Sequence, residues 1–371
     1  MMNYRRDLTN TLAMILVGGF AFGQAYRDTI EPKKGKPKEG LEVFEETYKA
    51  INWTSKDLGS QKQSYPTSRV KAVKHGDAPG DYFSATTKMV NRDFDNAITS
   101  FKRAATNKKV RPWIHPYTKY KIARCYQLSA RTAEAARAYE KMLSEHSQHF
   151  LAPSAHHRAA DSYLAMKDLE KALAHFKKLA STDFGDEWVL MAQDGMARVL
   201  EAKKEFKAAS DKYRELVSQT RDKKNFQHIL NLGYKGLGRN QLKLNQPDKA
   251  VKTFNELRGI AQQLENQPGL AVAFNGIGDC LYRTGMFEDA ALQYLRVNIL
   301  YALDKNGKTD KEEDSRAIYQ AALCFRKLSL QQGIPKEKKL AWQARSLKLL
   351  NEVKGKYPGT PWGKRAKDEL H

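Results

Sequence analysis

The chain has 371 residues, which is enough for two ordinary domains or for one long array of repeats. Its 64 Lys and Arg residues against 42 Asp and Glu give a formal net charge of +22, an excess that favours anionic lipid or glycan, nucleic acid or acidic protein surfaces as partners. The cations are spread along the sequence, and no basic run is interleaved with aromatic residues, so no nucleic-acid partner is expected. A basic, solvated surface without a specific anionic partner is the alternative.

The N-terminus has the layout of a secretory signal peptide. Arg5 and Arg6 precede an apolar run over residues 12–22, and small residues end at Ala25, where cleavage is expected. The run is too short to span a bilayer comfortably. If it is not cleaved, residues 8–26 would anchor the chain with its body outside. We therefore expect residues 1–25 to direct export to the periplasm or cell envelope of a bacterium.

Residues 26–79 are predicted to be a charged linker with one short helix. Residues 31–40 are rich in Lys, Pro and Gly. Apolar residues at positions 41, 43, 44, 48 and 51 fit one amphipathic helix. Residues 52–80 are polar, contain Pro and Gly and show no periodicity, which indicates a mobile spacer.

A repeated spacing begins near residue 80. A large residue, two spacers, Ala, three spacers and an aromatic residue recur, as in Phe287, Ala290 and Tyr294. The recurring alanines are Ala97, Ala135, Ala172, Ala209, Ala250 and Ala290, separated by 38, 37, 37, 41 and 40 residues. A small residue stands twelve positions before each: Ala85, Ala123, Ala160, Ala197, Gly238 and Gly278. This period predicts a solenoid of helix pairs in which small residues allow the helices to approach closely.

This pattern resembles the tetratricopeptide repeat. The resemblance implies an all-α fold: a right-handed superhelical solenoid of antiparallel helix pairs over residues 80–371, following the signal segment and the flexible linker. It implies about six or seven pairs, the last of them degenerate, and a C-terminal capping helix at 364–370. The period exceeds the 34 residues of the family, which implies longer turns. The junctions at 149–160 and 356–366 resemble turns of bacterial envelope tetratricopeptide proteins.

No catalytic, cofactor-binding or metal-binding constellation is found. His146, His149, His156 and His157 cluster without metal-ligand spacing and are interpreted as turn and surface histidines. The sequence 304–310 lacks the glycine position of a calcium loop. The three cysteines, Cys125, Cys280 and Cys324, exclude a disulfide framework and a CxxC site. We expect them to be small buried residues, with one pairing left open.

The resemblance maps the inner groove of the array onto exposed positions of the first helix of each pair. The candidate partner-binding residues are Tyr120, Arg124, His157, Asp161, Asp194, Arg198, Lys235, Arg239, Asn275 and Asp279. The family's carboxylate clamp, which needs Lys and Asn in successive repeats, is not met because Asn275 stands alone. A solvated face with ion pairs between repeats is the alternative for these residues.

The sequence therefore predicts a non-enzymatic, exported scaffold that binds a protein or peptide in the cell envelope. The alternative is a basic adaptor that binds an anionic envelope polymer or lipid, with or without a membrane anchor. No cofactor is expected, and the oligomeric state is left open.

Overall fold

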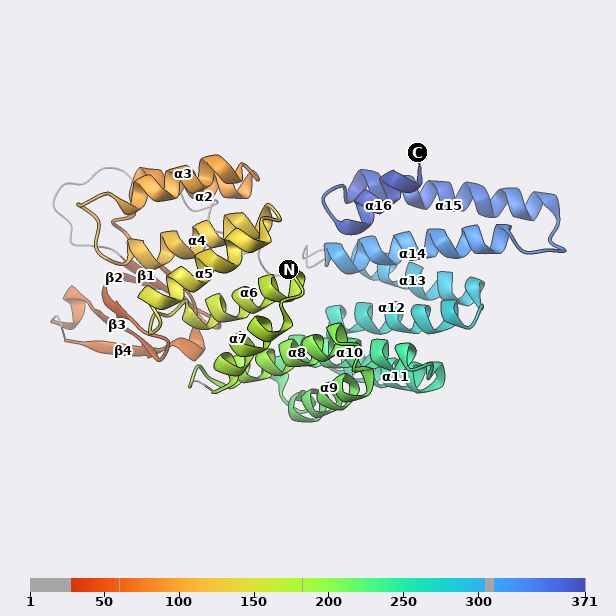
Figure 1. The fold of residues 1–371 in the computed structure, drawn as a ribbon, viewed down its shortest axis with the longest axis horizontal. Coiled ribbons are helices and arrows are strands. Elements are labelled where there is room, and N and C mark those ends of the chain that lie inside the picture. Colours follow the sequence, from red (N-terminus) through yellow and green to blue (C-terminus); the bar gives the residue numbers. More distant parts are fainter. Residues whose placement is uncertain (1–27, 60, 182, 304–309, 371) are drawn as a thin grey trace. The chain divides into compact units, whose positions relative to one another are not determined.

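The computed structural model describes residues 28–59, 61–181, 183–303 and 310–370. The chain divides into two compact units after Ala202, and each is described by itself (Figure 1). The predicted signal or anchor segment, residues 1–25, lies outside the described residues. Within them, no helix is both long enough and apolar enough to cross a membrane.

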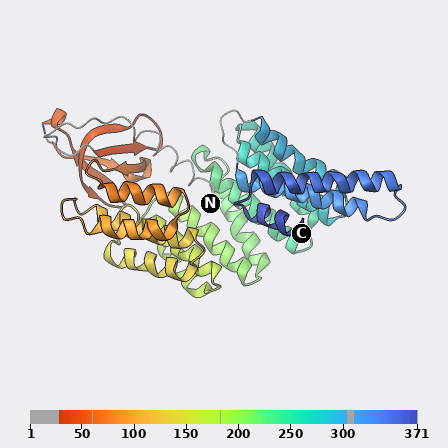
Figure 2. The ribbon, with the colours of Figure 1, turned by 90° about the horizontal axis from the view of Figure 1, so that it is seen from above.

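The first unit begins with an antiparallel sheet whose strands lie in the order β4-β3-β2-β1-β5. Figures 1 and 2 show that this N-terminal sheet is curved. Its elements are β1 (Asp28–Pro32), β2 (Lys38–Glu46), β3 (Ala50–Thr54), η1 (Lys56–Leu58), β4 (Gln63–Pro66), η2 (Thr67–Arg69) and β5 (Val70–Lys74). Alternate side chains of the strands form a small core of their own: Ile30, Leu41, Val43, Ile51, Trp53, Val70 and Val73.

The prediction of a linker with one helix at 26–79 is therefore wrong, and the chain is not all-α. Positions 41, 44, 48 and 51 have helical spacing, but 41 and 44 belong to β2, 51 belongs to β3, and 48 lies in the turn between these strands. The register shifts between Val43 and Glu45, so a bulge breaks the period of two that would have revealed β2. The segment predicted to be a mobile spacer supplies β3, β4 and β5.

Helices make up the rest of both units. Those of the first unit are α2 (Gly80–Val90), α3 (Phe94–Ala105), α4 (Ile114–Leu128), α5 (Thr132–Glu145), α6 (Ala152–Ala165), α7 (Leu169–Ser181) and α8 (Asp186–Ala202). Those of the second are α9 (Phe206–Thr220), η3 (Lys224–Phe226), α10 (Gln227–Lys243), α11 (Pro247–Gln263), α12 (Gln267–Arg283), α13 (Phe287–Ala302), α14 (Lys311–Ser329), α15 (Lys336–Lys356) and α16 (Pro361–Glu369). Helices adjacent in sequence pack side by side within each unit.

The repeated residues pack as their spacing predicts. All six recurring alanines have no exposed surface, and Tyr294 is 1% exposed. The ring of Tyr294 occupies the space beside Gly278: a Cβ atom on this glycine would lie 2.7 Å from Tyr294 Cε1. A Cβ atom on Gly238 would lie 2.3 Å from Phe254 Cζ. The small residue of one helix thus makes room for the aromatic residue of the next.

The turn inside each helix pair has a left-handed backbone residue five positions before the recurring alanine. Gly285 and Asn245 are residue types that tolerate this conformation. The other copies use side chains that do not favour it: Arg92 (φ 65°), Ala130 (φ 61°), Lys167 (φ 63°) and Lys204 (φ 65°). The turn geometry is therefore set by helix packing in these copies.

The C-terminal end of the second unit consists of three helices. Helices α14 and α15 pack as a pair, and α16 packs on both through Ala366 and Trp362. The Thr360 hydroxyl caps α16 by accepting a hydrogen bond from the Gly363 amide at 3.0 Å. The three cysteines are buried, as predicted, and all three are free, so the pairing left open by the sequence is not formed. Burial raises the pKa of each thiol to about 12.

The N-terminal sheet contacts three successive turns between helix pairs of the first unit. Arg111, before α4, reaches Asp28 in β1. His149, before α6, forms a bridge with Thr47, and the Tyr48 amide donates to Gln148 O at 2.9 Å. Before α8, Phe184 packs edge-to-face on Tyr48 with ring centroids 4.9 Å apart.

Candidate functional site

Four of the predicted groove residues form one ion-pair cluster on α6 and α8. Arg198 Nη1 lies 2.9 Å from Asp161 Oδ1, and Arg198 Nε donates to Asp194 Oδ2 at 2.9 Å. His157 Nδ1 lies 3.4 Å from Asp161 Oδ2. Burial alone would raise the pKa of Asp161, but the neighbouring His157 and Arg198 hold that pKa below its ordinary value. The charges of this cluster are directed at one another.

Tyr120 and Arg124 are buried in the first unit, at 6% and 3% exposure. The Tyr120 hydroxyl lies 2.6 Å from Ser154 Oγ and accepts a hydrogen bond from Arg158 Nε at 2.9 Å. Arg124 donates to the side chain of Gln127. Tyr120 therefore links α4 to α6, whereas Arg124 bonds within α4, and burial makes both unavailable to a partner.

In the second unit, two predicted residues converge on a glutamate that sequence analysis did not single out. Lys235 on α10 pairs with Glu313 on α14. Asn275 on α12 donates through Nδ2 to Glu313 Oε2 at 2.7 Å. Burial would raise the pKa of Glu313, but Lys235 and Arg316 hold it below its ordinary value. This cluster joins α10, α12 and α14. Its central side chain, Glu313, is only 3% exposed and is therefore shielded from solvent.

The remaining two predicted residues, Arg239 and Asp279, line an open cleft of about 620 Å³ within the second unit. The cleft combines basic and aromatic side chains. Its walls are Arg239, Leu242 and Lys243 of α10, Asp279, Tyr282 and Arg283 of α12, Phe287 and Tyr294 of α13, and Gln320 and Lys327 of α14. We call this feature the basic cleft.

Four cations of the basic cleft are exposed, whereas its one carboxylate is occupied. Arg316 Nη2 donates to Asp279 Oδ1 at 2.6 Å and to Oδ2 at 2.5 Å. The Tyr294 hydroxyl donates to Asp279 Oδ1 at 2.7 Å. Burial and the Asp279 charge raise the pKa of Tyr294 well above its ordinary value, so the tyrosine remains a donor. Asp279 is thus neutralised within the wall.

Lys243, Arg283 and Lys327 occupy one register in three successive repeats. Each follows by five positions a small residue of its helix: Gly238, Gly278 or Ala322. The same offset in α2, α4, α6 and α8 holds Val90, Leu128, Ala165 and Ala202. This contrast was present in the sequence and could have revealed the cleft, but the resemblance directed attention to other positions of the helices.

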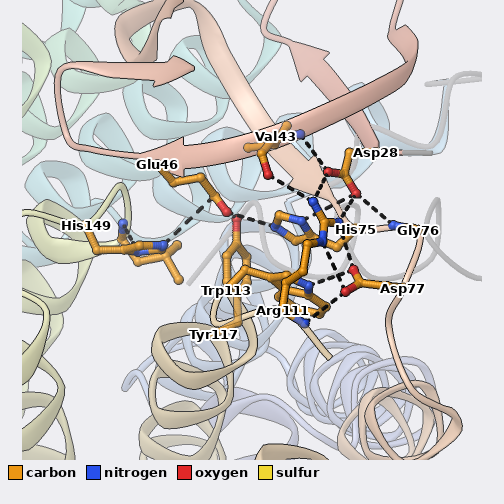
Figure 3. A network of polar contacts seen from close by, with 11 residues as sticks. Asp28, Val43, Glu46, His75, Gly76, Asp77, Arg111, Trp113, Tyr117 and His149 are labelled. Carbon is orange, nitrogen blue, oxygen red and sulfur yellow. Dashed lines mark hydrogen bonds and ion pairs between the residues drawn. The ribbon is translucent and has the colours of Figure 1, made fainter. Parts of the chain in front are cut away.

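The densest polar cluster lies where the N-terminal sheet meets α4 (Figure 3). Arg111 donates to Asp28 through Nη1 at 2.8 Å and Nη2 at 2.6 Å, and to Asp77 through Nε at 3.1 Å and Nη2 at 2.8 Å. The Val43 and Gly76 amides also donate to Asp28. Trp113 Nε1 donates to Asp77 Oδ1 at 2.8 Å. We call this cluster the sheet junction.

Two histidines of the sheet junction have opposite pKa shifts. His75 lies 2.8 Å from Glu46 Oε1 and stacks on Trp113 with ring centroids 4.1 Å apart. Burial lowers the pKa of His75, but Asp28 and Glu46 outweigh this and raise it overall. Burial lowers the pKa of His149 to about 4, although its ring nitrogen is 3.9 Å from Glu46. The neighbouring carboxylates therefore favour the charged form of His75, whereas burial favours the neutral form of His149.

The residue types Asp28, His75 and Asp77 could in principle hold a cation, since their ligand atoms lie within 4.8 Å of one another. The guanidinium of Arg111 bridges both carboxylates, however, and places its positive charge where an ion would sit. A divalent cation would have to displace this bidentate pairing. The sheet junction is better explained as a structural joint.

The histidines interpreted as turn and surface residues are more buried than predicted. His156 and His175 approach within 3.1 Å through their Nδ1 atoms. Burial lowers the pKa of His156 to about 4. His149 contacts the N-terminal sheet, a surface that sequence analysis did not foresee because it assigned those residues to a linker.

Comparison with known proteins identifies the repeats. The tetratricopeptide repeat profile matches residues 117–149 and 154–183, which span α4–α5 and α6–α7. The predicted resemblance to tetratricopeptide repeats is confirmed over these residues. No curated protein matches the chain.

Solved structures with similar helical arrangements share little sequence with the chain. One is a tetratricopeptide repeat protein from Parabacteroides merdae, 16% identical over 72% of this chain and 97% of that chain, with a TM-score of 0.44. Another is pilF of Pseudomonas aeruginosa, 15% identical over 68% of this chain and 97% of that chain, with a TM-score of 0.40. The repeat profile, and not these structures, carries the identification.

Proposed function

We propose that this chain is an exported, non-catalytic scaffold of the bacterial cell envelope that holds a segment of a partner protein in the basic cleft. Tetratricopeptide repeats form protein–protein interaction scaffolds and are generally non-catalytic, and the chain carries such repeats. The basic cleft is the observation that carries the proposal, because most predicted groove residues are engaged by other side chains of the same unit, whereas the cleft presents exposed Lys243, Arg283 and Lys327.

Export is supported by the sequence of the N-terminus, where two arginines precede an apolar run that ends in small residues. Fractionation of cells that produce the C-terminally tagged chain tests it. The expected result is a shortened species in the periplasmic or envelope fraction, whose N-terminal residue is Tyr26. A full-length species confined to the cytoplasm would contradict export.

Site-directed photocrosslinking tests the binding surface. A photoreactive phenylalanine analogue at Tyr282, in the basic cleft, is expected to crosslink a defined partner in envelope preparations. The same analogue at Phe83, which is 42% exposed and belongs to α2, is the matched control. If both positions give the same products, or if Tyr282 gives none, the cleft is not the binding surface.

A basic adaptor for an anionic envelope polymer or lipid is the second candidate, and the net charge of +22 favours it. Ionic strength separates the two. Binding through dispersed charge falls steeply as salt shortens the Debye length to roughly 3 Å at 1 M. Binding that also buries the rings of Tyr282 and Phe287 should retain a salt-insensitive part. Complete loss at high salt would favour the adaptor.

A further inference from the structure

The basic cleft has a surplus of positive charge that its own wall does not neutralise. Among the residues that the structure describes, no carboxylate pairs with Lys243, Arg283 or Lys327. Lys243 does lie over the Phe206 ring, 4.7 Å from its centroid, which leaves the ammonium charge uncompensated. A bound segment that supplied carboxylates would form charge-assisted hydrogen bonds with these side chains.

A preference of helix ends for cations does not explain the arrangement. Lys243 and Arg283 end α10 and α12, where the helix dipole favours positive side chains. Every helix has this dipole, yet α2, α4, α6 and α8 carry Val90, Leu128, Ala165 and Ala202 at the same register. The cations at this register lie on α10, α12 and α14, three of the four helices that line the cleft.

The helix ends in the cleft also decide what kind of anion fits. Phosphate groups in proteins are commonly held by backbone N–H groups at helix N-termini. Here α10 and α12 contribute their C-terminal residues, where the dipole is negative, and α13 contributes its first residue, Phe287. The exposed positive charges of the cleft are carried by the side chains of its lysines and arginines. Carboxylates spaced along a peptide suit cations that repeat from helix to helix better than one compact phosphate does.

An apolar surface lies beside these cations. The rings of Tyr282 and Phe287 contact each other edge-to-face, with centroids 5.2 Å apart, and Leu242 lies in the same wall. An aromatic or aliphatic side chain can pack there and bury area that a sugar phosphate or lipid headgroup does not offer. The combination of cations and apolar side chains in one wall thus matches an amphipathic ligand.

We infer that the occupant of the basic cleft is an acidic peptide segment in which Asp or Glu residues flank an aromatic or large aliphatic residue. The carboxylates pair with Lys243, Arg283 and Lys327, and the apolar side chain packs against Tyr282 and Phe287. This inference rests on the proposed function, because it names the partner chemistry of the same cleft.

Fluorescence anisotropy of the exported chain with a short labelled peptide, one Phe flanked by Asp and Glu, tests the inference. The double variant Lys243→Glu/Lys327→Glu should weaken binding at least about tenfold, as expected for losing charge-assisted hydrogen bonds. The control Lys249→Glu/Lys252→Glu changes the net charge equally at exposed positions of α11, outside the cleft, and should change affinity less than about threefold. Peptides with Asn and Gln for the acids, or Gly for Phe, should bind more weakly.

The outcomes are distinct. Equal losses in both double variants would show attraction by net charge alone and overturn the inference. So would equal binding of the Asn/Gln peptide. A third outcome is that inorganic phosphate or vesicles with anionic lipid bind the chain, that this binding is lost in the Lys243→Glu/Lys327→Glu variant, and that the peptide does not bind. This outcome would assign the cleft to a different anion. Thermal unfolding of each variant shows whether it is folded, and the milder Arg283→Gln should lose part of the affinity.

The photocrosslinking result separates this inference from the proposed function. If the analogue at Tyr282 captures a partner whose contacting segment is neutral, the cleft is a binding surface but the acidic chemistry is wrong. If neither the peptide nor a partner binds at Tyr282, the proposed function itself fails.

Discussion

At the scale of single residues, the spacing of small and aromatic side chains determined the helix packing. Gly278 and Tyr294 lie in different helices, yet their offset from Ala290 placed them in contact. A single sequence could predict this because the same geometry recurs six times. The contact leaves no room for an added methyl group.

Gly278→Ala is therefore expected to destabilise the second unit, by roughly 1–3 kcal/mol in free energy of unfolding, because the new Cβ would lie 2.7 Å from the Tyr294 ring. The control is Gly259→Ala in α11, where no atom lies within 4 Å of the added Cβ. That variant should gain about 0.5–1 kcal/mol from helix propensity. Urea denaturation measures both, and a stabilised Gly278→Ala variant would refute the packing argument.

The partners of the predicted groove residues could not be read from the sequence. Glu313 is 78 positions from Lys235 and 38 from Asn275, and nothing local marks it as their common acceptor. Family positions identify which side chains face one surface of a repeat, but they do not say which of them neutralise each other. Of the ten predicted residues, four pair with one another, two share Glu313 as their partner, and two others, Tyr120 and Arg124, are buried.

At the scale of elements, helices were predicted and strands were not. Helices have a strong repeating signal over most of the chain, whereas β2 is interrupted by a bulge and β4 has only four residues. Short strands gain their stability from pairing with distant segments, such as β1 with β5, which local patterns do not report. The composition of residues 31–40 then favoured a linker, although it forms the β1–β2 connection and the start of β2.

The turns between paired helices offer a prediction at this scale. Ala130 has φ 61° in the turn between α4 and α5 and is exposed. A left-handed backbone costs a residue with a Cβ roughly 1–2 kcal/mol, and glycine avoids this cost. Ala130→Gly is thus expected to stabilise the first unit by about 1 kcal/mol in free energy of unfolding. The greater conformational entropy of glycine in the unfolded chain offsets part of this gain.

Thermal unfolding measures the gain. The matched control is Ala138→Gly, inside α5, where the backbone has ordinary helical geometry. Glycine relieves no strain there and has a lower helix propensity than alanine, so this variant should lose stability. Equal destabilisation of both variants would contradict the strain assigned to the turn.

At the scale of the whole molecule, the sheet junction ties two kinds of architecture together. Asp28 has no exposed surface and depends on Arg111 for its bidentate partner. Arg111→Met would leave the Asp28 and Asp77 carboxylates without that charge, and removal of one partner of a buried pair costs about 3–5 kcal/mol. We expect β1 and β5 to lose hydrogen-exchange protection first.

Arg131→Met is the control, because Arg131 pairs with Asp95 and Glu134 at an exposed site and its loss should leave the protection of β1 and β5 unchanged. Hydrogen exchange monitored by mass spectrometry compares the two variants. If the strands of the Arg111 variant remained as protected as in the native chain, the joint would not depend on this residue.

The contacts of the N-terminal sheet with three successive turns also bear on how the first unit comes apart. In a simple solenoid each repeat contacts only its neighbours, so the terminal repeats can unfold one at a time while the rest of the array stays folded. Here Arg111, His149 and Phe184 attach separate repeats to one small sheet. Local unfolding of any one of these repeats would break a contact with the sheet to which the other repeats are also attached. Helices α2–α8 are therefore expected to unfold in one cooperative step. They are also expected to resist mechanical extension as one rigid unit.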